Sequence, residues 1–194
     1  AVFGLLTTTV AESARHLDMV AGPDGRDRLS LPRPTLGYED AIEALDVSGL
    51  RARWSEDLGF AVTDREVATV TRDAAGVLAD TAGLRLDEEP VDLGDPVRLW
   101  FRAGAADLWL DLERGMWPDV AEDVTPFVRR ALEMTQDYPV PRYAEVLRLR
   151  EVLQAHMAAV FDEVDVLLCP TTAVPAFAAD GPPRVDFGVV RQQD

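Results

Sequence analysis

A short apolar run near the C-terminal end of the chain places the strongest constraint on its fold. Residues 164–169 are apolar apart from Asp165, and Pro170 follows them directly. An apolar run without polar alternation is typical of a strand buried on both faces of a mostly parallel sheet. Because proline has no amide hydrogen to donate to a neighbouring strand, sheet pairing should end before it. We therefore expect a central strand, which the chain leaves at Cys169.

Two threonines just after this strand are candidate substrate-binding residues. Thr171 and Thr172 follow Pro170 in the sequence, and open α/β sheets usually hold ligands beyond the carboxyl ends of their strands. The alternative is that both hydroxyl groups only satisfy backbone groups of the local turn. Both interpretations stay open.

The middle of the chain predicts a βαβ unit. Residues 50–54 alternate in polarity and indicate a strand, Thr63 with Glu66 forms a capping-box pattern, and a helix should end at Gly83. Residues 84–88 then return as a strand, which should be parallel to the first. The apolar face expected on the helix consists of Val67, Val70, Ala74, Val77 and Leu78. We therefore predict an α/β fold: part of a mixed, largely parallel sheet flanked by helices.

Other helices complete this prediction. Thr9 with Glu12 opens a helix near the N-terminus, and Gly22 ends it. A helical insertion is expected at about residues 95–140, and a long helix then leads into the apolar strand. One ordinary core fits a chain of 194 residues, 47% of them hydrophobic.

The helical insertion carries further candidates. Trp100 should pack against neighbouring helices, whereas Trp117 and Tyr138, in expected loops, are weak candidates for an apolar substrate pocket. Arg130 is a candidate for neutralising a substrate carboxylate, although a solvated arginine is the simpler interpretation because Arg129 adjoins it. Trp117, Tyr138, Arg130 and the two threonines are the predicted substrate-binding set.

Charge and residue usage exclude several functions. The net charge is −16, and all 19 basic residues are arginine, so a nucleic-acid partner is not expected and no lysine is present to act as a base. Cys169 is the single cysteine, beside two histidines, which excludes a disulfide and a recognisable zinc pattern; we expect it to be an inert core residue. We predict a cytoplasmic protein without a membrane span, metal or cofactor.

Three blocks of the sequence resemble the amidase signature family of hydrolases. Residues 4–24 are similar to the family's GPLxRTVxDAAxLLDxxAGxD segment, and residues 162–177 to its FDxxDVLLxPTxxxPAF segment; residues 49–51 form a third block between them. The blocks occur in the family's order. The resemblance implies hydrolysis of a carbon–nitrogen amide bond through a serine acyl-enzyme, with a lysine and a second serine activating the nucleophile.

The chain departs from the family where catalysis is concerned. The family's catalytic lysine and its glycine- and serine-rich segment lie upstream of the block that begins here at Gly4, so we assign no catalytic residue. We expect residues 1–194 to form one incomplete amidase-like α/β domain. Exposed sheet edges should make it unstable, dimeric or dependent on a complementary polypeptide.

Three functional hypotheses follow. The chain is a portion of an amidase whose catalytic residues lie elsewhere, a catalytically dead homologue that binds a small molecule or a partner, or the amidase component of a tRNA-dependent amidotransferase. The acidic balance of the chain ranks the third hypothesis below the first.

Overall fold

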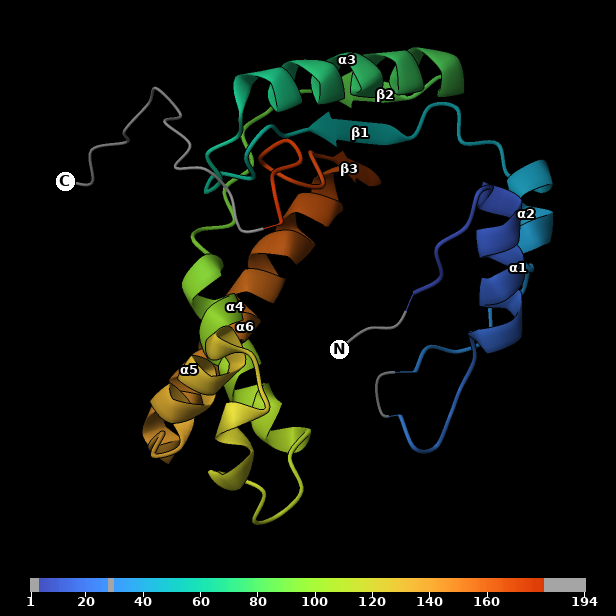
Figure 1. Cartoon of the computed structure of the whole chain (residues 1–194). Coiled ribbons are helices and arrows are strands. Elements are labelled where there is room, and N and C mark those ends of the chain that lie inside the picture. Colours follow the sequence, from blue (N-terminus) through green and yellow to red (C-terminus); the bar gives the residue numbers. More distant parts are fainter. Residues whose placement is uncertain (1–3, 28–29, 180–194) are drawn as a thin grey trace. The chain divides into compact units, whose positions relative to one another are not determined.

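The computed structural model describes residues 4–27 and 30–179 of the chain. These residues fall into two compact units, one ending at Ser48 and one beginning at Gly49 (Figure 1).

Two short helices form the first unit. Helix α1 (Val10–Val20) begins with the predicted capping box, because Glu12 N donates to Thr9 Oγ1 at 3.2 Å and Thr9 N donates to Glu12 Oε2 at 3.2 Å. The α1 prediction is therefore confirmed.

Helix α2 (Tyr38–Ala44) was not predicted, because its cap comes from α1. The carboxylate of Asp18 accepts hydrogen bonds from the backbone N of Tyr38 at 2.7 Å and of Glu39 at 3.0 Å. Arg15 forms an ion pair with Glu39. These contacts join α1 and α2 side by side.

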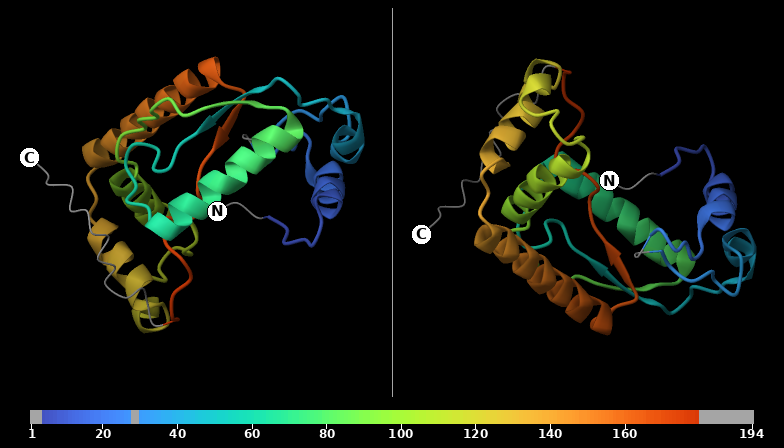
Figure 2. Two further views of the ribbon diagram at one scale, coloured as in Figure 1. Left: turned by 90° about the horizontal axis from the view of Figure 1, so that it is seen from above. Right: turned by 90° about the horizontal axis from the view of Figure 1, so that it is seen from below.

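A three-stranded parallel sheet lies in the second unit. Its strands are β1 (Arg51–Trp54), β2 (Arg85–Asp87) and β3 (Val166–Leu168), in the order β2-β1-β3. Helix α3 (Arg65–Ala82) connects β1 to β2 and runs along one face of the sheet (Figure 2). The α/β prediction, including its βαβ unit, is confirmed.

The predicted order of burial was wrong for β3. Strand β1 occupies the centre of the described sheet, whereas β3 lies at its edge and is only half-buried. In β1, Ala52 and Trp54 are buried, and Arg53 is buried as well because its guanidinium is paired with two carboxylates. The paired arginine hides the central strand from a search for apolar runs.

The end of β3 is where the proline predicted it. The amide of Ser55 donates to the carbonyl oxygen of Leu168 at 2.9 Å, and the chain leaves the sheet at Cys169. Cys169 is exposed, so the expectation of a core cysteine was wrong. The strand ends one residue earlier, and Cys169 lies in the loop.

Helix α3 ends as predicted at Gly83, which has a left-handed φ of 67°. Its cap is Asp64 rather than Thr63, because the Thr63 hydroxyl donates to the carbonyl oxygen of Glu56. The expected apolar face was also wrong. The residues of α3 buried against the sheet are Ala68, Ala75 and Ala79, whereas Val70, Val77 and Leu78 are exposed.

The helical insertion contains α4 (Val97–Asp107), two short 3-10 helices at Leu108–Leu110 and Asp119–Glu122, and α5 (Pro126–Thr135). Helix α6 (Val140–Glu163) then leads back to the sheet, as predicted. Helix α4 packs against α5 and α6, and its core consists of Leu99, Ala103 and Val146.

A buried hydroxyl fixes the α4–α5 contact. Thr135 Oγ1 donates to the carbonyl oxygen of Ala131 at 2.7 Å and accepts a hydrogen bond from Trp109 Nε1 at 2.8 Å. Trp109 is therefore a packed tryptophan of the insertion. Trp100, for which we expected packing, is 71% exposed.

Candidate functional site

The loops that follow the three strands meet at one edge of the sheet. Because the strands are parallel, their carboxyl ends share this edge, where ligands of α/β sheets usually bind. Backbone hydrogen bonds join the loops: Leu93 N donates to Leu58 O at 3.1 Å, and Asp64 N donates to Ala173 O at 2.7 Å. We call this region the strand-end face.

One hollow of the strand-end face lies between the loops after β1 and β3. It has a volume of about 250 Å³, and its lining includes Asp57, Phe60, Cys169 and Thr171. Partial burial raises the pKa of the Cys169 thiol. The thiol therefore stays protonated at neutral pH and is a poor nucleophile.

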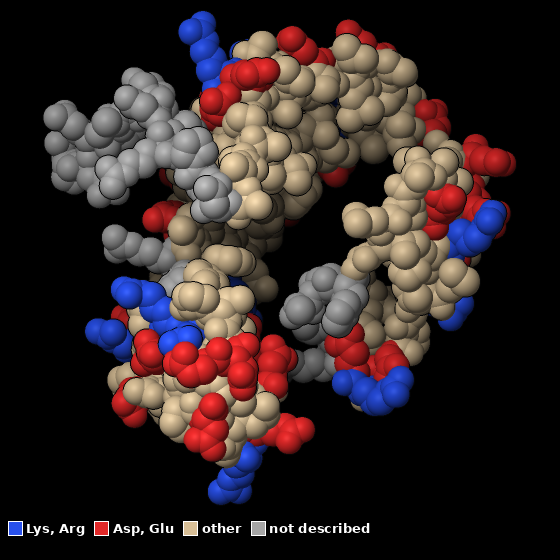
Figure 3. All heavy atoms as spheres, viewed as in Figure 1, with Lys and Arg blue, Asp and Glu red and all other residues tan. Residues whose placement is uncertain are grey.

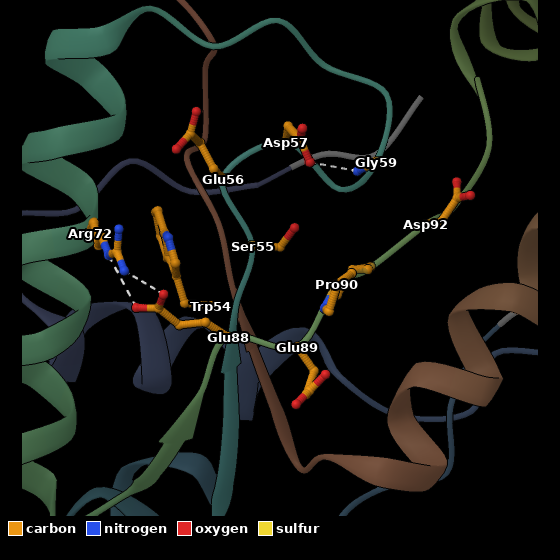
Figure 4. Close-up of a pocket in the computed structure, with 11 residues that line it drawn as sticks. Trp54, Ser55, Glu56, Asp57, Gly59, Arg72, Glu88, Glu89, Pro90 and Asp92 are labelled. Atoms are coloured by element: carbon orange, nitrogen blue, oxygen red, sulfur yellow. Dashed lines mark hydrogen bonds and ion pairs between the residues drawn. The ribbon is translucent and has the colours of Figure 1, made fainter.

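A second hollow lies between the loops after β1 and β2 (Figure 4). Arg72 forms an ion pair with Glu88 beside the ring of Trp54. Acidic side chains predominate in the lining, which includes Glu56, Asp57, Glu88, Glu89 and Asp92. In the described part of the chain, no group of histidine, cysteine or acidic side chains is arranged to hold a metal ion.

A glycine allows the two loops of the second hollow to approach closely. Gly59 has a φ of +82°, and a Cβ atom at this position would lie 2.7 Å from Asp92 Cα and from Val91 O. The amide of Gly59 also donates to Asp57 Oδ1 at 2.8 Å (Figure 4). Any side chain here would push the loops apart.

The hydroxyl of Ser55 has a structural contact at this face. Ser55 is buried, and its Oγ accepts the amide hydrogen of Leu58 at 3.0 Å. This bond closes the turn after β1. With no lysine in the sequence, the chain cannot provide a lysine-activated serine.

The two predicted threonines lie at the strand-end face and differ in their contacts. Thr171 lines the first hollow. The Thr172 hydroxyl donates to the carbonyl oxygen of Val174 at 3.1 Å, which is the turn contact considered as the alternative.

The other three predicted residues lie in the helical part of this unit. Trp117 packs edge-on against Trp109, with ring centroids 6.0 Å apart, and its Nε1 donates to Gln136 Oε1 at 3.2 Å. Tyr138 packs against the α4–α6 core, and Arg130 is exposed on α5. None of these three residues lines the hollow beside Thr171.

Sequence reasoning missed an apolar groove in the insertion. Its lining includes the exposed rings of Trp100 and Phe127, with Gly104 and Leu108 between them along α4 and the turn after it. A glycine in the middle of a helix was the available signal.

The surface charge agrees with the sequence. Figure 3 shows acidic side chains gathered in a band over the helical insertion. None of the helices in the described part of the chain combines the length and apolar character that a membrane span needs.

Comparison with curated proteins gives relatives over most of the chain. An amidase of Pseudomonas putida is 30% identical over 176 residues, which are 89% of this chain and 37% of that protein. An acylamidase of Rhodococcus erythropolis is 46% identical over 70 residues, 36% of this chain and 14% of that protein. One component of the glutamyl-tRNA(Gln) amidotransferase of Chloroflexus aggregans is 26% identical over 199 residues, covering 90% and 40%. The chain therefore spans at most two fifths of the length of these relatives.

Solved structures agree with these relatives. A bacterial aryl acylamidase of the amidase signature enzymes family matches with a TM-score of 0.74 and 26% identity, over 91% of this chain and 38% of that one. A protein complex related to an s-triazine catabolic enzyme matches with a TM-score of 0.67 and 21% identity, over 89% and 36%, and so shares the fold. No protein-family model matches the chain.

Proposed function

Because the chain belongs to the amidase signature family, we propose that it forms part of an enzyme that hydrolyses a carbon–nitrogen amide bond. The similarity to the Pseudomonas amidase over most of the chain carries this proposal. In the proposed reaction, a serine attacks the amide carbonyl and forms an acyl-enzyme, which water then hydrolyses. We place the nucleophile and its lysine outside these residues, because the sequence holds no lysine.

In this proposal, the chain supplies scaffold and cleft wall as one incomplete domain over residues 1–194, with its helical insertion at about 95–140. Thr171 and Thr172 would line the substrate cleft from the strand-end face, and the first hollow beside Thr171 supports this role. Trp117, Tyr138 and Arg130 would contact substrate from the insertion. The proposed chemistry uses no metal or cofactor.

The proposed partner is the remainder of the amidase fold or a second copy of the chain. The exposed apolar face of α3, formed by Val70, Val77 and Leu78, supports this proposal, because burying it would stabilise the assembly. Among the described strands, β2 and β3 each have one edge without a neighbouring strand, and such edges favour further pairing.

An assay of amide hydrolysis tests the proposed function. The protein in its natural full length and residues 1–194 alone would be compared on aliphatic and aryl amides, with product amine as the readout. We expect turnover only from the full-length protein. Turnover by residues 1–194 alone would contradict the assignment of the catalytic groups. Inertness of both would favour a catalytically dead homologue that binds a small molecule or partner.

A second candidate function is that of an amidotransferase component, favoured by the match to the Chloroflexus protein over 90% of the chain. Affinity purification of the full-length protein from its own cells discriminates between the two. A stoichiometric second polypeptide, together with glutamine-dependent activity, would favour the amidotransferase. Activity on simple amides without a partner polypeptide would favour the amidase.

A further inference from the structure

Helices α4 and α5 leave an apolar groove between them, which we call the α4–α5 groove. Its lining includes Trp100, Gly104 and Leu108 on one side and Phe127 and Val128 on the other, and its volume is about 200 Å³. The ring of Trp100 is 71% exposed and that of Phe127 is 59% exposed. Two large aromatic side chains therefore form walls that remain open to solvent.

A glycine keeps this groove open at the expense of helix stability. Gly104 lies inside α4 (Val97–Asp107), where glycine is less favourable than alanine. A Cβ atom built on Gly104 would meet no heavy atom within 4 Å. Close packing of the two helices therefore does not require the glycine. Its effect is to leave free volume between the aromatic walls.

We propose that the α4–α5 groove binds one aromatic ring of a small, uncharged ligand. Charge complementarity selects a neutral group, because the residues that line the groove carry no charge. The walls formed by Trp100 and Phe127 suit an aromatic ring, which prefers offset or edge-on contact with other rings.

The size of the groove also favours a ring over a peptide. A cavity of about 150 Å³ lined by apolar side chains is sufficient to bind benzene, and this groove is somewhat larger. A helix, about 10 Å across with its side chains, would not enter it. An extended peptide would bring backbone N–H and C=O groups that apolar side chains cannot satisfy.

The test uses fluorobenzene and the protein in its natural full length. Because it needs no turnover, its outcome is independent of the proposed amide hydrolysis on which the family assignment bears. We expect saturable binding with a Kd on the order of 1 mM, followed by ¹⁹F NMR. Intermolecular nuclear Overhauser effects should connect the ring to the methyl groups of Leu108 and Val128. Effects to methyl groups elsewhere, or no saturable binding, would overturn the proposal.

A filling variant and a matched control sharpen the test. Gly104→Leu places a side chain in the groove and should weaken fluorobenzene binding at least about tenfold. Gly76→Leu makes the same change inside α3, where a Cβ atom also meets nothing within 4 Å, and should leave binding within about twofold of the unsubstituted protein. Equal binding by the protein and Gly104→Leu would refute the proposal. If Gly104→Leu does not fold, the Overhauser effects on the unsubstituted protein decide.

Discussion

Substitution of Arg53 tests whether paired charges hold the sheet together. The Arg53 side chain is 9% exposed, and its Nε donates to Asp87 Oδ1 at 2.7 Å while its Nη1 donates to Glu163 Oε2 at 2.8 Å. One side chain of β1 thus contacts β2 and the last turn of α6. Hydrogen bonds to Asp87 and then to Glu163 raise the pKa of the guanidinium further. Arg53 therefore keeps its charge at any pH at which the protein folds.

The magnitude follows from how deeply each partner is buried. Removing one member of a fully buried ion pair costs about 3–5 kcal/mol. The side chains of Asp87 and Glu163 are 44% and 64% exposed and can regain water, so we expect Arg53→Ala to cost about 2–3 kcal/mol. Asp87→Ala leaves the buried guanidinium with one carboxylate and should cost about 1–2 kcal/mol. Glu163→Ala removes one exposed bond and should cost about 1 kcal/mol or less.

Urea unfolding of the natural full-length protein at pH 7, followed by far-UV circular dichroism, measures these changes. Arg26→Ala is the control, because Arg26 pairs with Asp24 in solvent and its side chain is 91% exposed; its effect should stay within about 0.5 kcal/mol. The reasoning fails if Arg53→Ala changes the free energy of unfolding no more than Arg26→Ala does. It fails equally if Glu163→Ala costs more than Asp87→Ala.

Three further predictions concern single contacts. Asp18→Ala removes the acceptor that caps α2 and should destabilise that helix by about 1–2 kcal/mol; hydrogen exchange of residues 38–44 should accelerate, and unchanged exchange would contradict the capping role. Gly59→Ala should cost more than about 1 kcal/mol, because φ is +82° and a Cβ would lie 2.7 Å from Asp92 Cα; thermal unfolding measures it, and an unchanged midpoint would disprove the close approach. Hydrogen bonds from Arg51 lower the pKa of Asp165 from 3.8 to about 2, so the pair should stabilise the fold above pH 4 and lose this effect as the pH falls from about 4 towards 2. Urea unfolding across that range should show a weaker acid dependence for Asp165→Asn than for the natural protein, and equal dependence would refute the assignment.

Local backbone signals were predictable from the sequence. The capping box of Thr9, the end of α3 at Gly83 and the exit from the sheet before Pro170 all appear where the sequence placed them. Each has a cause within a few residues along the chain. Helix α2 lacked such a signal, because its capping residue, Asp18, lies 20 positions before Tyr38.

Burial was less predictable, because it depends on which element a residue meets. A scale of hydrophobicity ranks Val70 and Val77 above Ala68 and Ala75, yet α3 turns its alanines toward the sheet. Small side chains allow a helix and a sheet to approach closely, and this geometry is absent from the sequence pattern. For the candidate site, the sequence placed Thr171 at the strand ends, but it gave no account of the acidic loops around it.

The charged residues of the sheet also specify its register. In β1, Arg53 lies opposite Asp87 of β2, and Arg51 donates through its backbone N and its guanidinium to Asp165, the residue just before β3. The strands contain only three or four residues each, so apolar contacts alone would distinguish poorly between neighbouring registers. A slip of one residue turns every side chain to the opposite face. Here it would separate Arg53 from Asp87 and bury an unpaired guanidinium, which makes the paired register strongly preferred.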